Sequence, residues 1–160
     1  DPVFTIGEQI AETIVRHEGI SQTDAWRRAL ELLEMVQIPS AARRLKNYPH
    51  EMSGGMRQRA MIALALSCRP SVLLADEPTG NLDTASGRQI MDILRDIDEE
   101  RRLTTLIVTH DPVWASVCDR IVRVVDGRIS EDLTMAGEEP APRNFHQRAA
   151  SGHVIRRMTL

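Results

Sequence analysis

Apolar side chains in the first 68 residues recur at helical spacing. Ile6, Ile10 and Ile14 lie four residues apart, which predicts a helix with a narrow apolar stripe. A second helix is predicted after Ser21, which forms the pattern of a capping box with Asp24. The apolar face of this second helix comprises Ala25, Ala29, Leu32 and Val36. We therefore predict a helical subdomain over residues 1–68.

A glycine turn opens the last helix of this subdomain. Residues 40–52 are mostly polar and are predicted to form an irregular connection. Ser53-Gly54-Gly55 follows, and a helix is predicted from Met56 to about Ser67. Ser53 is the predicted N-cap, because a serine hydroxyl can accept a hydrogen bond from a free N–H group of the first turn.

Strand and helix patterns alternate in the next section. The continuous apolar run Val72–Ala75 predicts a strand buried on both faces, as in a parallel sheet that is covered by helices. A helix with a core-facing apolar stripe is predicted over Ala85–Glu99. A second buried strand is predicted over Thr105–Val108.

This alternation predicts an α/β fold after the helical subdomain. The core portion of that fold is predicted over residues 69–132, and it includes a two-residue hairpin turn at Asp126-Gly127. Residues 133–160 have no clear period, so we predict a loosely ordered tail with at most one short helix.

Length and composition fit one globular domain without a membrane span. The chain has 160 residues, of which 42% are hydrophobic and 27% charged, and its net charge of -3 does not indicate nucleic-acid binding. No apolar stretch approaches the roughly 20 residues that cross a bilayer, so membrane contact is expected to be peripheral. Cys68 and Cys118 lie outside any metal-ligand spacing and are expected to be reduced thiols.

Three features carry the candidate chemistry. Asp76 and Glu77 end the first strand, His110 ends the second, and Ser53-Gly54-Gly55 opens a helix. Each alone is also an ordinary strand end or turn. Together they fit phosphate chemistry, because bare glycine N–H groups at a helix N-terminus attract an anion. A strand-end aspartate can hold hydrated magnesium, a glutamate can orient or deprotonate a water, and an imidazole can contact the γ-phosphate.

These motifs resemble those of the ATPase subunits of ATP-binding cassette (ABC) transporters over about residues 1–132. SGGMRQR at Ser53–Arg59 resembles the signature motif of that family, whose usual form is LSGGQ. VLLADEP at Val72–Pro78 resembles the Walker B strand, NLD at Asn81–Asp83 the D-loop, and THD at Thr109–Asp111 the H-loop. The resemblance implies an incomplete P-loop NTPase (RecA-like) fold with a parallel sheet and a helical subdomain.

The resemblance also implies roles in ATP hydrolysis. Asp76 would serve Mg²⁺, Glu77 would be the catalytic base, and His110 would contact the γ-phosphate of ATP. Asp83 would communicate across the interface between two ATPase subunits, which in this family close as a head-to-tail dimer. The residues that would reach the nucleotide bound on the second subunit are Ser53, Gly54, Gly55 and Met56.

By the same resemblance, the helical subdomain would dock on transmembrane permease subunits at the cytoplasmic face of the inner membrane. The chain contains no G-x-x-x-x-G-K-[ST] motif, so it is similar to the C-terminal part of a nucleotide-binding domain. Because the P-loop supplies most contacts to the β- and γ-phosphates, we expect this chain alone to bind ATP poorly and to hydrolyse little. We also expect apolar surface or a sheet edge to be exposed.

Several functions stay open. DPVFTIGEQI and NYPHEMSGGMRQRAMIALAL, with Met56 in place of the usual glutamine, resemble the oligopeptide and nickel importer branch. DEPTGNLDTASG is closer to the lipoprotein-release and macrolide-export branch. A non-catalytic interaction fragment is the alternative from a different class. Soluble ABC ATPases of DNA repair or translation are less similar, because the chain has neither a long coiled-coil insertion nor a second cassette.

Overall fold

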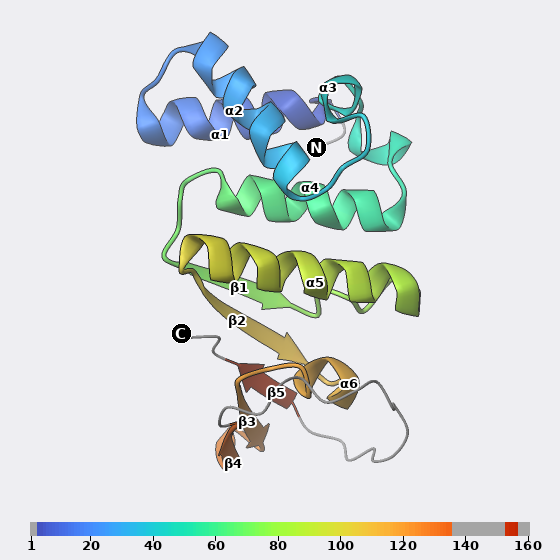
Figure 1. Ribbon diagram of the computed structural model, residues 1–160, viewed down its shortest axis with the longest axis vertical. Coiled ribbons are helices and arrows are strands. Elements are labelled where there is room, and N and C mark those ends of the chain that lie inside the picture. Colours follow the sequence, from blue (N-terminus) through green and yellow to red (C-terminus); the bar gives the residue numbers. More distant parts are fainter. Residues whose placement is uncertain (1–2, 136–152, 157–160) are drawn as a thin grey trace. The chain divides into compact units, whose positions relative to one another are not determined.

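The computed structural model describes residues 3–135 and the backbone of residues 153–156 (Figure 1). In chain order, its elements are α1 (Ile6–Glu18), α2 (Gln22–Met35), α3 (Ala41–Arg44), the 3-10 turn η1 (Pro49–Glu51), α4 (Gly54–Leu66), β1 (Val72–Asp76), α5 (Thr84–Arg101), β2 (Thr104–Thr109), α6 (Pro112–Ala115), β3 (Arg120–Val125), β4 (Arg128–Thr134) and β5 (His153–Arg156). A helical section is thus followed by alternating strands and helices, which confirms the α/β class.

The chain forms two compact units. The first comprises residues 1–70 and 81–93, and the second comprises residues 71–80 and 94–160. The predicted helical subdomain ended at residue 68, but the first unit also includes the D-loop segment and the first half of α5. Residues 81–93, which the sequence pattern assigned to the core portion, thus belong to the same compact unit as residues 1–70.

Helices α1 and α2 form the core of the first unit with the stripes that the sequence predicts. Their predicted core-facing residues are Ile6, Ile10, Ile14, Ala25, Ala29, Leu32 and Val36, and all are buried. Ser21 caps α2 by accepting a hydrogen bond from the N–H group of Asp24 at 3.1 Å. Helix α1 ends at Gly19, whose positive φ of 67° gives the left-handed cap that favours glycine.

A close backbone approach fixes the start of α1. The N–H group of Gly7 donates to the carbonyl oxygen of Leu45 at 2.8 Å, and the ring of Trp26 covers the Cα of Gly7 so closely that no side chain fits there. The connection over residues 40–52 was predicted to be irregular, but it contains α3 and η1. This part of the prediction was wrong, because single turns are too short to show a period.

A mixed five-stranded sheet organises the second unit. The strand order is β1-β2-β5-β3-β4, with β1 and β2 parallel and all other neighbours antiparallel. The predicted hairpin turn is present, with Asp126 and Gly127 both at positive φ between β3 and β4. Strand β5 lies within the segment that was predicted to be a loose tail, whereas residues 136–152 and 157–160 lie outside the described part.

Strand β1 is buried on one face only, contrary to the prediction. Leu73 is buried, whereas its neighbours Val72 and Leu74 are 57% and 65% exposed. Strand β2 alternates in the same way between buried and half-buried side chains, with Ile107 on the buried face. The described residues cover one face of this strand pair, so the predicted exposure of apolar surface is observed.

Candidate functional site

The carboxyl ends of β1 and β2 bring the paired acids and the histidine to one edge of the sheet. The strands are parallel, with Asp76 opposite Val108 in the register. The N–H group of Glu77 donates to the carbonyl oxygen of Val108 at 2.8 Å, so pairing continues one residue beyond β1. His110 directly follows β2. Asp76, Glu77 and His110 therefore lie at the same end of the two strands, as parallel strand ends require.

Glu77 leaves the strand direction and turns towards the end of β2. Its φ of 44° is in the left-handed region, which is uncommon for a residue with a side chain. Oε1 of Glu77 accepts a hydrogen bond from the backbone N–H group of His110 at 2.9 Å and lies 2.6 Å from Nδ1 of that imidazole. Oε2 accepts a hydrogen bond from the Thr109 hydroxyl at 3.2 Å. Both carboxylate oxygens are thus held by the end of one strand.

This geometry favours the charged forms of Glu77 and His110. Partial burial is the largest single influence on the pKa of Glu77 and raises it, but the bonds and charge of His110 and the Thr109 hydroxyl together leave that pKa below its usual value. The hydrogen bond and charge of Glu77 raise the pKa of His110. With Nδ1 directed at Glu77, the Nε2 atom of an imidazole that is 73% exposed remains available to a ligand.

Thr109 is a site residue that the sequence did not single out. Its side chain is buried, donates to Glu77 and accepts a hydrogen bond from the N–H group of Asp111 at 3.1 Å. Asp111 in turn caps α6 by accepting a hydrogen bond from the N–H group of Val113 at 2.8 Å. A polar residue on the inward face at the end of a buried strand was the available signal, because such a hydroxyl needs a partner.

Asp76 fits a magnesium ligand by its chemistry and position. Its carboxylate is exposed at the carboxyl end of β1, next to Glu77. Mg²⁺ prefers oxygen ligands, keeps several waters and is commonly held by one or two carboxylates together with substrate phosphates. Within residues 3–135, the structure shows no cluster of three or more His, Cys, Asp or Glu side chains that could hold a metal. The donor set therefore fits an ion that substrate and water help to hold.

The signature turn lies in the first unit and opens α4. Ser53 is the N-cap, with its hydroxyl accepting a hydrogen bond from the N–H group of Met56 at 3.3 Å. Gly54 and Gly55 form the first turn of the helix. Because glycine has no side chain, the backbone of this turn can come close to an anion, which the N-terminus of a helix favours.

Asp83 lies in the same unit and caps α5. Its Oδ1 accepts hydrogen bonds from the N–H groups of Ala85 and Ser86 at 3.0 and 2.9 Å, and its Oδ2 accepts from the Ser86 hydroxyl at 2.7 Å. The hydrogen bonds from Ser86 lower the pKa of Asp83. The sequence did not predict this local role, although an aspartate before a helix is a common N-cap.

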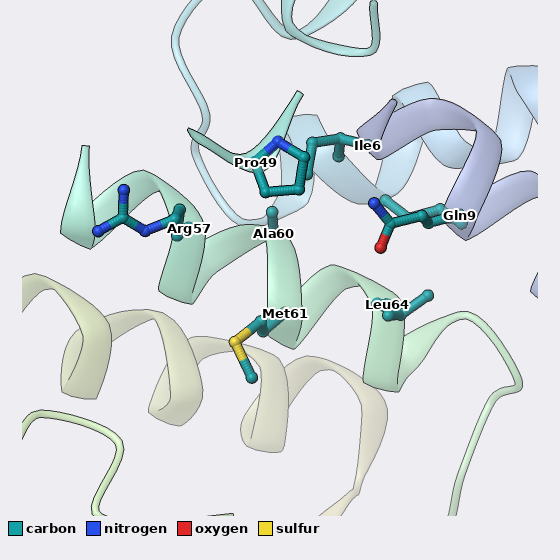
Figure 2. A pocket seen from close by; sticks show the side chains of 8 residues that line it. Ile6, Gln9, Pro49, Arg57, Ala60, Met61 and Leu64 are labelled. Carbon is teal, nitrogen blue, oxygen red and sulfur yellow. The ribbon is translucent and has the colours of Figure 1, made fainter. Parts of the chain in front are cut away.

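An apolar hollow of about 210 Å³ opens on the first unit. Figure 2 shows its lining side chains, which come from α1, η1 and α4. Met61 is 63% exposed at this hollow, and Gln9 and Arg57 add polar groups to the lining. No helix in the described part of the chain has the length and apolarity needed to span a bilayer.

Comparisons with known proteins agree with the motifs. Residues 2–80 match the sequence model of the ABC transporter family. The probable peptide ABC transporter ATP-binding protein y4tR of Sinorhizobium fredii (strain NBRC 101917 / NGR234) is 44% identical over 96% of this chain, and the match covers 46% of y4tR. The glutathione import ATP-binding protein GsiA of Escherichia coli (strain K12) is 44% identical over 93% of this chain and 24% of GsiA.

A solved structure shares the fold. The dimeric post-hydrolysis structure of the ATP-binding cassette MJ0796, bound to ADP and Pi, is similar with a TM-score of 0.74 and 34% identity. The match covers 86% of this chain and 60% of that chain. The chain therefore spans about half the length of y4tR, about a quarter of GsiA and three-fifths of the MJ0796 cassette.

Proposed function

Because the chain belongs to the ABC transporter ATPase family, we propose that it supplies the signature, Walker B and H-loop residues of an ATP-hydrolysing transport subunit. The observation that carries the proposal is the bonded pair of Glu77 and His110, which lies beside Asp76 at one sheet edge. Hydrolysis of the γ-phosphate needs a base or water-positioning group and a donor to the phosphate oxygens. Glu77 and His110 are suited to these two tasks.

Glu77 would act on the attacking water. Since the pKa of Glu77 is below its usual value, the carboxylate is charged at neutral pH and can accept a hydrogen bond or a proton. The same carboxylate orients the imidazole of His110, so that a protonated ring can donate from Nε2 to a γ-phosphate oxygen. Asp76 would hold Mg²⁺, which, when bound, neutralises charge on the transferred phosphate.

The signature turn would act on a second subunit. Ser53, Gly54, Gly55 and Met56 present the N-terminus of α4, whose free N–H groups and dipole favour a phosphate. We propose a head-to-tail dimer in which this turn completes the nucleotide site of the partner subunit. The MJ0796 cassette, which has a similar fold, is dimeric and binds ADP and Pi. Asp83, at the start of α5, would transmit changes across that interface.

Import of peptides or related small molecules is the proposed transport process. The relatives y4tR and GsiA are named for peptide transport and glutathione import. The subunit would bind transmembrane permeases at the cytoplasmic face of the membrane. Export by a lipoprotein-release or macrolide-type system is the alternative, which the DEPTGNLDTASG segment supports.

The proposal is tested by completing the cassette and measuring magnesium-dependent ATP hydrolysis. We expect this chain alone to hydrolyse little, and to gain activity when an N-terminal half that contains a P-loop is supplied in cis or in trans. Glu77→Gln should then lower kcat by about a hundredfold or more, because a positioned base contributes roughly that factor. Glu12→Gln, at an exposed position of α1, is the matched control. Equal activity of Glu77→Gln and wild type would remove Glu77 from the mechanism.

A non-catalytic interaction fragment is the second candidate, which the hollow on the first unit favours. Its apolar lining and the exposed Met61 suit a protein partner more than a nucleotide. This candidate predicts that a permease is retained by the chain in a pull-down without nucleotide, and that Met61→Asp removes the retention. It also predicts no ATP hydrolysis after the cassette is completed, which separates it from the leading proposal.

A further inference from the structure

Arg59 joins three segments of the first unit through one guanidinium group. Its Nη1 donates to the backbone carbonyl oxygen of Gln37 at 2.6 Å, and its Nη2 donates to Oε1 of Gln89 at 2.7 Å. Gln37 follows α2, Arg59 lies on α4 and Gln89 lies on α5. A guanidinium can hold two acceptors in fixed directions because it is planar and carries several donors.

The carbonyl group of Gln37, which accepts one of the two Arg59 bonds, is held in place by the local backbone. Gln37 has a positive φ of 56°, and its N–H group donates to the carbonyl oxygen of Glu34 at 2.8 Å. The next residue, Ile38, donates to the carbonyl oxygen of Leu33 at 2.9 Å and is buried. The end of α2 is therefore held by its own backbone, and Arg59 ties α4 and α5 to it.

The Arg59 bond continues a contact that begins at the signature glycines. Gly55 and Arg59 are four residues apart on α4, and Ser86 and Gln89 are three apart on α5, so each pair shares a helix face. A Cβ built at Gly55 would lie 3.7 Å from the Ser86 side chain, and one built at Gly54 would lie 3.5 Å from Leu82. The signature turn and the D-loop thus meet at one end of the contact between α4 and α5, and Arg59 lies at the other end.

Asp83 connects this contact to the D-loop itself. Its carboxylate binds the hydroxyl and N–H groups of Ser86, the residue that packs on Gly55. A displacement of Asp83 would therefore move Ser86, and with it the side chain against which the signature glycines rest. Without a second bond one turn farther along, the first half of α5 could move away from α4 and absorb that displacement.

We propose that Arg59 is a positioning residue that makes the signature turn and the D-loop move as one body. This inference rests on the proposed function, which places both motifs at the interface with a second subunit. Arg59 itself touches no reacting atom. It would set the distance between Ser53–Met56 and Asn81–Asp83, so that closure at one motif aligns the other.

Hydrogen exchange on this chain tests whether the Arg59 bonds hold α4 and α5 together, without any assumption about ATP. Arg59→Gln should speed the exchange of the N–H groups of Ala85–Gln89 about fivefold, because a lost hydrogen bond changes the opening equilibrium by roughly that factor. Gln89→Ala should give a similar increase, and the double variant should add little to either, since both single variants remove the bond between Arg59 and Gln89. Arg27→Gln, which breaks an exposed pair with Asp24, is the control. Unchanged exchange in Arg59→Gln would overturn the tie.

Kinetics of the completed cassette test the coupling. Arg59→Gln should lower kcat about tenfold with the KM for ATP changed less than about twofold, because misalignment affects the transition state more than nucleotide binding. Arg59→Lys should restore part of kcat, since an ammonium retains the charge but not two directed bonds. If the wild type hydrolyses ATP and Arg59→Gln matches it, the coupling is wrong while the proposed function stands. A wild type that fails to hydrolyse contradicts the proposed function, and the exchange result is unaffected.

Discussion

Replacing Thr109 by valine should release one oxygen of the Glu77 carboxylate while leaving β2 intact. The Thr109 hydroxyl donates to Oε2 of Glu77 at 3.2 Å and accepts from the N–H group of Asp111 at 3.1 Å. The side chain is 1% exposed, so its hydroxyl is shielded from water and makes both bonds within the protein. Valine has almost the same shape and suits a strand as well as threonine does. The substitution therefore removes two hydrogen bonds and little else.

The expected loss of stability follows from these contacts. Each hydrogen bond contributes about 1 kcal/mol net, and leaving the Asp111 N–H group without its acceptor costs about 1 kcal/mol more. The additional buried methyl group of valine offsets about 0.8 kcal/mol of this loss. The free energy of unfolding of Thr109→Val should therefore fall by about 2 kcal/mol. For a chain of this length, that change lowers Tm by roughly 4–8 °C.

Thermal unfolding followed by circular dichroism measures this loss. Thr109→Ser is the matched control, because it keeps the hydroxyl and removes only a methyl group, at a cost of about 1 kcal/mol. Carbon-detected NMR of the Glu77 carboxyl adds a local readout, since the Thr109 hydroxyl lowers the pKa of that group. The pKa of Glu77 should rise in Thr109→Val and stay unchanged in Thr109→Ser. A Tm for Thr109→Val equal to that of wild type would refute the hydrogen-bonding argument.

Three further results are expected. The contribution of His110 to stability should be complete below pH 6.5 and should be lost as the pH rises through its raised pKa. An NMR titration of the imidazole should show that the pKa of His110 falls in Glu77→Gln. An unchanged pKa would contradict the pairing of these two side chains. Gly7→Ala should lower the free energy of unfolding, measured in urea, by roughly 1–3 kcal/mol, because the new Cβ would lie 2.4 Å from the Trp26 ring. A variant as stable as wild type would show that the ring can move. Leu74→Lys, at a position 65% exposed, should change the free energy of unfolding by less than about 0.5 kcal/mol and reduce light scattering. A large loss of stability would instead place Leu74 in the core.

Long periodic segments were predictable from the sequence because their burial follows from spacing alone. The stripe of Ile10 and Ile14 and the four-residue face of α2 are buried as expected. Ser53 was predicted as an N-cap, and its hydroxyl accepts the expected hydrogen bond. Each of these features depends on neighbours a few residues away in the chain.

Features that depend on distant partners were missed. A continuous apolar run cannot show whether one or two faces of a strand are covered, so the exposure of Leu74 differed from the prediction. Strand β5 pairs with β2 and β3 across a long sequence separation, and nothing in its own four residues indicates that pairing. The bond between Arg59 and Gln89 likewise joins residues 30 apart. Parallel strands end at the same edge, so the proximity of Glu77 and His110 was expected, but the hydrogen bond between them was not.

The left-handed backbone at residue 77 limits which substitutions can report on chemistry. A β-branched residue such as valine or threonine is strongly disfavoured at this φ, so its introduction would shift the turn as well as remove the carboxylate. Glutamine and asparagine tolerate the conformation better, and glycine relaxes it altogether. Lost turnover in a β-branched replacement would thus mix altered loop geometry with the missing base, whereas an amide of equal length isolates the proton acceptor.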